Sequence, residues 1–173
     1  PGGSLGGLTT AGTNASGQAT FNGLSITGLA GAYTLQFTSP GLTGVSSTSV
    51  NLTAGAPTQV AITTPPPATA QSGIAMAPAT VVQLQDVSGN AVSTSGTTIV
   101  AALVSGGGTL TGTLTVPTVA GGASTFSNLV LTGTIGPRAI RFTSGSLTPD
   151  TSAVITLAAG NAEAGKARSV ACG

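Results

Sequence analysis

Residues 19–44 read ATFNGLSITGLAGAYTLQFTSPGLTG, and residues 124–149 read STFSNLVLTGTIGPRAIRFTSGSLTP. Both stretches belong to one ungapped self-alignment in which residues 2–57 match residues 107–162 at an offset of 105, with 23 identical pairs among 56. Identity of this kind at one fixed offset indicates an internal duplication. The fold of the chain is therefore expected to contain the same strand pattern twice.

Side chains in the duplicated stretch alternate with the two-residue period of a β-strand. Between residues 33 and 38 the apolar residues occupy the odd positions and the polar residues occupy the even positions. At the matching place in the second copy we expect Ile140 and Phe142 to point inward, and Arg141 and Thr143 to point outward. The pattern predicts a strand with one face in a hydrophobic core.

The duplication divides the chain into three parts. Residues 57–160 form one complete unit, residues 1–56 correspond to the C-terminal half of a unit, and residues 161–173 are a non-repeat tail. The first unit begins midway, and its other half is expected upstream in the gene, lost by processing, or replaced by a strand from another chain. Strands of the complete unit are expected at 58–64, 79–87, 97–104, 109–116, 123–132, 138–144 and 151–158. Seven short strands separated by turn signals predict a β-sandwich.

Two stretches rich in turn-forming residues agree with this prediction. The sequence Ser-Gly-Asn at residues 88–90 tolerates a left-handed backbone and is expected to turn the chain between two strands. The three prolines at residues 65–67 cannot donate ladder hydrogen bonds. We therefore expect them either to end the first strand or to carry it along an edge between two sheets.

The composition favours β-structure and argues against two classes of function. Hydrophobic residues make up 40% of the 173 residues, aromatic residues only 3% and charged residues only 4%. Strong helix formers are scarce and the apolar runs are short, so no long helix is expected. The formal net charge is +1 and residues 1–85 carry no charged side chain, which leaves little to bind a nucleic-acid backbone. No stretch approaches the roughly 20 consecutive apolar residues that a membrane-spanning helix needs.

Residue types that carry catalysis or bind metals are sparse. The chain has no histidine, the commonest general base and metal ligand. Residues 2–6, GGSLG, match the G-x-S-x-G nucleophile pattern, but without a histidine we interpret them as a glycine-rich turn. The acids Asp86, Asp150 and Glu163 are spread widely in sequence, unlike the carboxylates of a calcium site. Asp86 is expected to fix the turn after it, with a weak surface calcium site as the alternative. We predict no catalytic residue, no metal ligand and no cofactor.

Position 33 and its counterpart at position 138 hold different residues. We expect Tyr33 to pack at a sheet end with its hydroxyl bonded to the backbone, as in the tyrosine corner of other sandwiches. Arg138, its counterpart, is expected to point to the same side of its strand as Arg141. The interpretation is a solvated or snorkelling basic pair, with an anion or partner contact as the alternative.

Four further residues are interpreted as incidental. Cys172 is the only cysteine, so it can form no internal disulfide. Asn14 and Asn51 match glycosylation sequons, which we attribute to chance. Lys166 is the only lysine and lies in the tail, where Gly165-Lys166 lacks the remainder of a phosphate-binding loop. Neither repeat unit can therefore form a Lys–Asn crosslink.

Three segments together resemble a known family. Residues 82–92, VQLQDVSGNAV, combine alternating apolar residues with Asp, Ser-Gly-Asn and further apolar residues, and residues 122–131 and the segment GPRAIRFTSG at 136–145 follow. The run resembles bacterial immunoglobulin-like domains of the invasin and intimin type, over residues 57–160 in full and 1–56 as the matching half. The resemblance implies an all-β fold of immunoglobulin-like β-sandwich modules in tandem, the first represented only by its C-terminal half. No ligand-binding residue carries over, because these domains share no common site.

The resemblance also implies a structural role outside the cytoplasm, since such domains are mostly stalks and display units of adhesins, secreted proteins and envelope assemblies. We expect a non-enzymatic, exported bacterial protein, periplasmic or at the cell surface. It would make protein–protein contacts as a scaffold or accessory subunit of a filament or of the exposed face of a large membrane complex. A nearly uncharged surface has to be covered by hydroxyl and amide groups, by sugar or by partners, which agrees with this expectation. The alternative is a stalk or spacer repeat of a surface adhesin. Partners are expected to be proteins or neighbouring repeats, with no nucleic acid and no small-molecule substrate.

Overall fold

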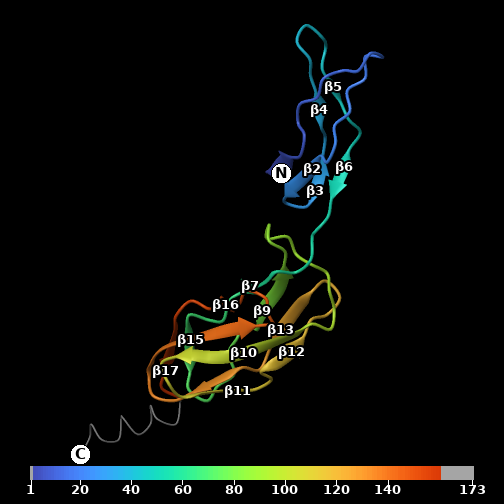
Figure 1. The fold of residues 1–173 in the computed structure, drawn as a ribbon. Helices are drawn as coiled ribbons and strands as arrows, with labels where there is room; N and C mark the ends of the chain where they lie inside the picture. The colour runs from blue at the N-terminus through green and yellow to red at the C-terminus, as the bar shows by residue number, and fades with distance from the viewer. Residues whose placement is uncertain (1, 161–173) are drawn as a thin grey trace, which may run out of the picture. The chain divides into compact units, whose positions relative to one another are not determined.

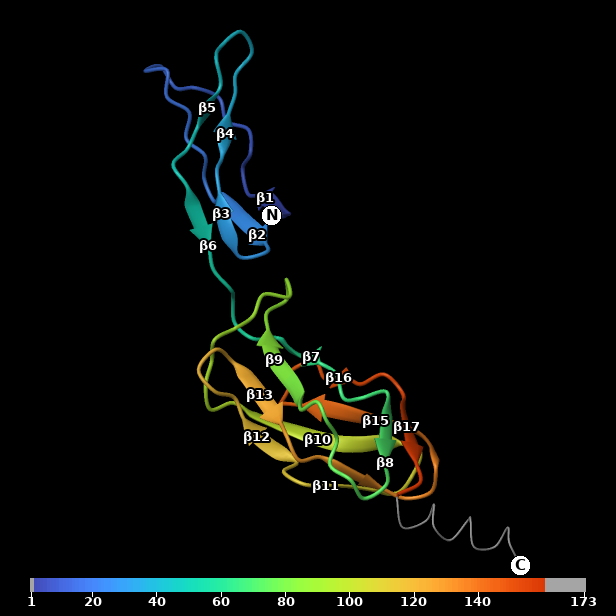
Figure 2. The same ribbon diagram turned by 180° about the vertical axis from the view of Figure 1, so that it is seen from behind.

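The computed structural model describes residues 2–160, and this range contains strands but no helix. The all-β prediction is confirmed for these residues, and none of them belongs to a helix that could span a membrane. The internal contacts divide the chain into two compact units, seen from opposite sides in Figures 1 and 2. Unit 1 comprises residues 2–55 and the turn Ser88–Asn90, and unit 2 comprises residues 56–87 and 91–160.

Unit 2 consists of two principal sheets and one short strand pair. Its strands are β7 (Gln59–Thr64), β8 (Thr69–Gln71), β9 (Thr80–Gln85), β10 (Thr98–Ser105), β11 (Thr109–Thr111), β12 (Thr115–Pro117), β13 (Ala123–Phe126), β14 (Val130–Thr132), β15 (Gly136–Thr143), β16 (Asp150–Thr151) and β17 (Ile155–Ala158). One sheet has the order β13-β9-β7, and the other has the order β12-β10-β15-β17-β8, with β16 also paired to β15. The pair β11-β14 is separate, and β8 runs parallel to β17 while the other pairings are antiparallel.

The hydrophobic core of unit 2 lies between these two sheets. Phe126 on β13 and Phe142 on β15 pack with their ring centroids 5.1 Å apart and their planes tilted by 59°. The alternate residues Val82 and Leu84 on β9 are 0% exposed. Ile140 and Phe142, predicted to point inward, are also 0% exposed, which confirms that prediction. The ring contact joins the two sheets face to face in a sandwich-like arrangement.

The three prolines at residues 65–67 carry the chain from one sheet to the other. The strand before them, β7, pairs with β9, and the strand after them, β8, pairs with β17. Both alternatives for this run hold, because β7 ends at Thr64 directly before the prolines and the prolines then carry the chain to the other sheet. The predicted turn at residues 88–90 is also present, because the chain reverses after β9 so that Ala91 pairs back with Gln85, and Gly89 has a φ of 82°.

Three of the seven strand predictions are wrong, because each predicted strand is divided into two strands in the structure. The predicted strand 109–116 breaks at Gly112, whose φ is 103° and whose position leaves no room for a side chain, since a Cβ would lie 2.1 Å from the Asn128 carbonyl oxygen. The predicted strand 123–132 breaks where the Asn128 side chain bonds Thr113, accepting from its amide at 2.9 Å and donating to its hydroxyl at 3.0 Å. The chain thereby leaves β9 and pairs with β11 instead.

The predicted strand 151–158 breaks at Ser152. Its hydroxyl oxygen accepts a hydrogen bond from the Ile140 amide at 3.1 Å and donates one to the Ala153 carbonyl at 2.8 Å, so a side chain interrupts the backbone ladder. The other four predicted strands are present, with ends shifted by one or two residues. Strand β8, which follows the prolines, was not predicted.

Unit 1 contains three short antiparallel pairs. Its strands are β1 (Gly3–Gly6), β2 (Ser25–Gly28), β3 (Gly31–Tyr33), β4 (Gln36–Phe37), β5 (Val45–Ser46) and β6 (Val50–Leu52). The pairs are β1-β2, β3-β6 and β4-β5.

The registers of these pairs recur in unit 2 at the offset of 105. Gly31 pairs with Leu52 in unit 1, and Gly136 pairs with Leu157 in unit 2. The same offset relates β1-β2 to β11-β14 and β4-β5 to β15-β16. The duplication therefore extends from the residues to their hydrogen-bonding partners.

The buried pair of rings generates a stability prediction. Replacement of Phe142 by alanine removes a fully buried ring from the core, so the free energy of unfolding of unit 2 is expected to fall by about 3–5 kcal/mol. Arg141→Ala is the matched control, because this exposed neighbour points the other way and should change stability by less than about 0.5 kcal/mol. Denaturant-induced unfolding, monitored by hydrogen exchange, measures the loss of stability in both variants. Equal losses in the two variants would show that the inward face is misassigned.

Candidate interaction face

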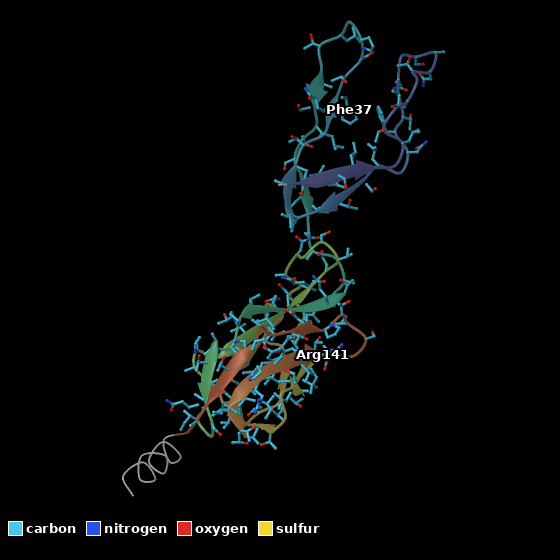
Figure 3. All side chains as sticks on the ribbon, turned by 90° about the vertical axis from the view of Figure 1, so that its left-hand side faces the viewer. Phe37 and Arg141 are labelled. Carbon is cyan, nitrogen blue, oxygen red and sulfur yellow. The ribbon has the colours of Figure 1, made fainter. Side chains whose placement is uncertain are left out.

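Unit 1 repeats the ring pair of the unit 2 core without its burial. Phe21 and Phe37 lie with their centroids 5.3 Å apart and their planes tilted by 53°. Both rings are only half-buried, whereas their counterparts Phe126 and Phe142 are 1% and 0% exposed. Figure 3 labels Phe37 on its strand. The same packing geometry is therefore open to solvent in unit 1.

The aliphatic residues around these rings are exposed in the same way. Leu5 on β1 pairs with Ile26 on β2, and Leu5 is 46% exposed while Ile26 is half-buried. The counterpart of Ile26 in unit 2, Leu131, is 1% exposed. No residue between positions 2 and 55 is fully buried. We call the following residues the open face: Leu5, Phe21, Leu24, Ile26, Leu35 and Phe37.

Three hollows mark the open face. A hollow of about 100 Å³ is lined by Leu5, Phe21 and Phe37 among others. A second, of about 220 Å³, lies between Leu5 and Tyr33, and a third, of about 260 Å³, is bounded by the two rings and Val45. The first 85 residues carry no charged side chain. A partner can therefore contact this face without removing any charged side chain of unit 1 from water.

The sequence prediction covered the open face only in part. The alternation at residues 33–38 is confirmed, because the odd positions are half-buried and the even positions are exposed. Leu5, Leu24 and Ile26 were not singled out as candidates for contact. The duplication offset could have identified them, since it aligns all three with leucines of unit 2.

Tyr33 in unit 1 and its counterpart Arg138 in unit 2 both donate hydrogen bonds to the backbone, but through different side-chain groups. The Tyr33 hydroxyl donates to the Leu29 carbonyl at 2.6 Å, which confirms the predicted bond to the backbone. Arg138 is 2% exposed and donates from Nη1 to the Pro137 carbonyl at 2.8 Å and from Nη2 to the Thr134 carbonyl. Thr134 is the counterpart of Leu29 at the offset of 105, so both residues bond to the same backbone position. The Nε atom of Arg138 is buried without a hydrogen-bond partner.

The prediction that Arg138 and Arg141 share one side of their strand is wrong. Residues three apart on a regular strand point to opposite faces. Arg138 is accordingly buried with Ile140, and Arg141, which is labelled in Figure 3, is exposed. The two guanidinium groups therefore form no shared basic site.

The acidic residues lie at separate places. Asp150 accepts hydrogen bonds from the Ile62 amide and from the Thr151 amide, each at 2.8 Å, and so connects β16 to β7. Asp86, directly after β9, is 5% exposed. Glu163 lies outside the described residues. Within the described range there is no group of three or more metal-ligating side chains.

The remaining candidates from the sequence have structural placements. Residues 3–6 of the GGSLG sequence form β1, so the prediction of a glycine-rich turn there is wrong; the ladder with β2 holds them extended, and the Ser4 and Thr27 hydroxyls are 2.9 Å apart. The Asn14 side chain accepts from the amides of residues 16 and 18, and Asn51 lies on β6. Lys166 and Cys172 lie outside the described residues.

Comparison of the sequence with protein-family models and with curated proteins finds no match to either.

The paired corners generate a second prediction. Arg138→Tyr should preserve the stability of unit 2, because the tyrosine hydroxyl can donate to Thr134 as Tyr33 does to Leu29. Arg138→Ala should lower it by about 1–3 kcal/mol, because two carbonyl oxygens lose a buried donor. Thermal unfolding of the two variants beside the unaltered chain measures the difference. An alanine variant as stable as the tyrosine variant would contradict a structural role for these bonds.

Proposed function

We propose that this chain is a non-catalytic, immunoglobulin-like structural protein that makes protein–protein contacts in an extracytoplasmic assembly of the bacterial envelope. The observation that carries the proposal is the open face, which leaves two phenylalanine rings and four aliphatic side chains partly in water. Monomeric domains rarely leave contiguous apolar surface of this kind unless it serves as a binding site.

The strand order of unit 2 supports an immunoglobulin-like fold. In such folds one sheet pairs the first, second and fifth strands, and the facing sheet pairs the third with the sixth and seventh. The sheets β13-β9-β7 and β10-β15-β17 follow this scheme, while β12, which lies between β10 and β13 in sequence, pairs with β10 and not with β13. The parallel pairing of β8 with β17 allows the first strand to contribute to both sheets. Together with the resemblance of residues 82–92 and 136–145, this order favours the family of invasin- and intimin-type domains.

A structural role agrees with how the polar residues are used. Asp150 is occupied by two backbone amides, and Arg138 by two backbone carbonyls. The sequence contains no histidine. These residues therefore stabilise turns and sheet ends, and the proposal assigns no reaction to any of them.

Large apolar side chains on unit 1 outside the open face also support contact with other proteins. Leu42 is 72% exposed and Val45 is 65% exposed. With no charged side chain in the first 85 residues, this unit offers a partner apolar groups, hydroxyls and amides alone. Contacts of this composition are typical of the central part of protein–protein interfaces, where charged residues are depleted.

The alternative proposal is a stalk or spacer repeat of a surface adhesin. The observation that favours it is the shared register of the two units at the offset of 105, which is what repeated modules of one stalk would have. The complete reading frame separates the two proposals. Several more units of about 105 residues would favour the stalk, and a short gene without further units would contradict it.

The proposed contact predicts uneven protection in the isolated chain. Backbone amides of unit 2 should exchange slowly with solvent, whereas those of residues 31–38 should exchange about as fast as in loops, because their apolar face is uncovered. A dye that binds exposed apolar surface should fluoresce with the chain, and Leu35→Ser should weaken this signal. Thr34→Ser, on the exposed side of the same segment, is the control. A monomer in which both units are equally protected would contradict the proposal.

A further inference from the structure

Unit 2 contains counterparts of the open-face residues in buried form. Phe142 and Ile140 on β15 correspond to Phe37 and Leu35 in unit 1, and both are 0% exposed. Their strand pairs with β10 through Ala101↔Phe142 and Leu103↔Ile140. Unit 2 therefore contains the strands that accompany the buried form of these residues. Those strands show what an occupant of the open face would look like.

The second covering strand is β9. It pairs with β13 through Thr80↔Phe126 and places Val82 and Leu84, both 0% exposed, in the core. Strand β10 adds Ile99, also 0% exposed. Strands β9 and β10 thus lie beside the two ring-bearing strands, one in each sheet, and each places aliphatic residues in the core.

Comparison of the two units at the offset of 105 shows which strand pairings of unit 2 have no counterpart in unit 1. Strand β4 pairs with β5 through Gln36↔Ser46 and Phe37↔Val45, which corresponds to the pairing of β15 with β16. The edge of β4 that corresponds to the β10 side of β15 pairs with no strand among the described residues. A free edge and an open apolar face on one strand fit an extended segment that adds to the sheet.

We propose that the open face is the docking surface for a segment with the strand pattern of residues 57–104, joined in the same polypeptide directly ahead of β1. The proposal rests on the open face being a contact surface, as proposed above, and names a segment of the same polypeptide as its occupant; contact with separate proteins is then left to the apolar side chains outside the open face, such as Leu42 and Val45. In unit 2 the chain runs from β10 through Gly106–Gly108 into β11, and β11 is the counterpart of β1. The same strand order places the donor immediately ahead of β1.

The chemistry of the donor matches the face. Asp86 is the one charged side chain among residues 57–104, and residues 57–85 carry none, so the β7-like and β9-like strands bring no charged group to the uncharged surface. Covalent linkage raises the effective concentration of the donor to about the millimolar range, which favours the linked segment over a separate chain. The geometry therefore favours a linked donor of this pattern over an unrelated protein.

The test uses an extended chain in which a second copy of residues 57–106 replaces Pro1 ahead of Gly2. Exchange of the segment 31–38 should then slow by about a hundredfold relative to the unextended chain, because the added strands cover its apolar face. The matched control carries Val82→Asp and Ile99→Asp in the added copy alone. It should exchange as fast as the unextended chain, with unit 2 as the internal reference.

Three results would overturn the proposal. The first is equal exchange of residues 31–38 in the extended chain and in its control. The second is slowing in the unextended chain as its concentration rises, which would mean that a second copy covers the face. The third is full protection by a separate 57–106 peptide at micromolar concentration, which would mean that linkage is not required. A failure of the proposed contact function gives a different result from these three, because residues 31–38 would then already be protected from exchange in the unextended monomer.

Discussion

Unit 2 depends on the closure of two sheets over one pair of phenylalanine rings. Phe126 and Phe142 come from different sheets, and both rings are buried in the core together with residues of β9 and β10. The stabilisation from such a contact scales with the apolar area that leaves water, at about 25 cal/mol per Å². The equivalent rings in unit 1 have nearly the same separation and tilt but remain half-exposed, so the same contact contributes less there.

The local geometry of unit 1 nevertheless persists without a closed core. Ser47 Oγ accepts from the Leu35 amide at 3.0 Å, and Ser152 Oγ accepts from the Ile140 amide at 3.1 Å, at the matching position of unit 2. Each of these bonds joins residues 12 apart in sequence and ties the strand to the segment that returns beside it. The strand course on the open face is therefore held by a bond within unit 1, which gives a docking segment a formed surface to meet.

The corner at positions 33 and 138 illustrates how one structural task tolerates different residues. A tyrosine hydroxyl and an arginine guanidinium each donate to the same backbone carbonyl position, Leu29 in unit 1 and Thr134 in unit 2. The arginine extends deeper and is 2% exposed, which places a charged group in the packed interior of a sheet end. Its role is thus the satisfaction of backbone acceptors, and the pair gives no support to an anion site.

The sequence by itself determined the all-β class, the duplication at 105 and the inward direction of Ile140 and Phe142, because strand alternation and repetition are local properties of the residues. It also indicated the bonded hydroxyl of Tyr33 and the crossing role of the three prolines. The tertiary structure alone decided where strands break, as at Gly112 and Ser152, since those breaks depend on the Asn128 carbonyl and the Ile140 amide from distant segments. It also decided that the side chains of the open face remain uncovered. Burial depends on what packs against a face, and a strand pattern specifies the face without specifying its cover.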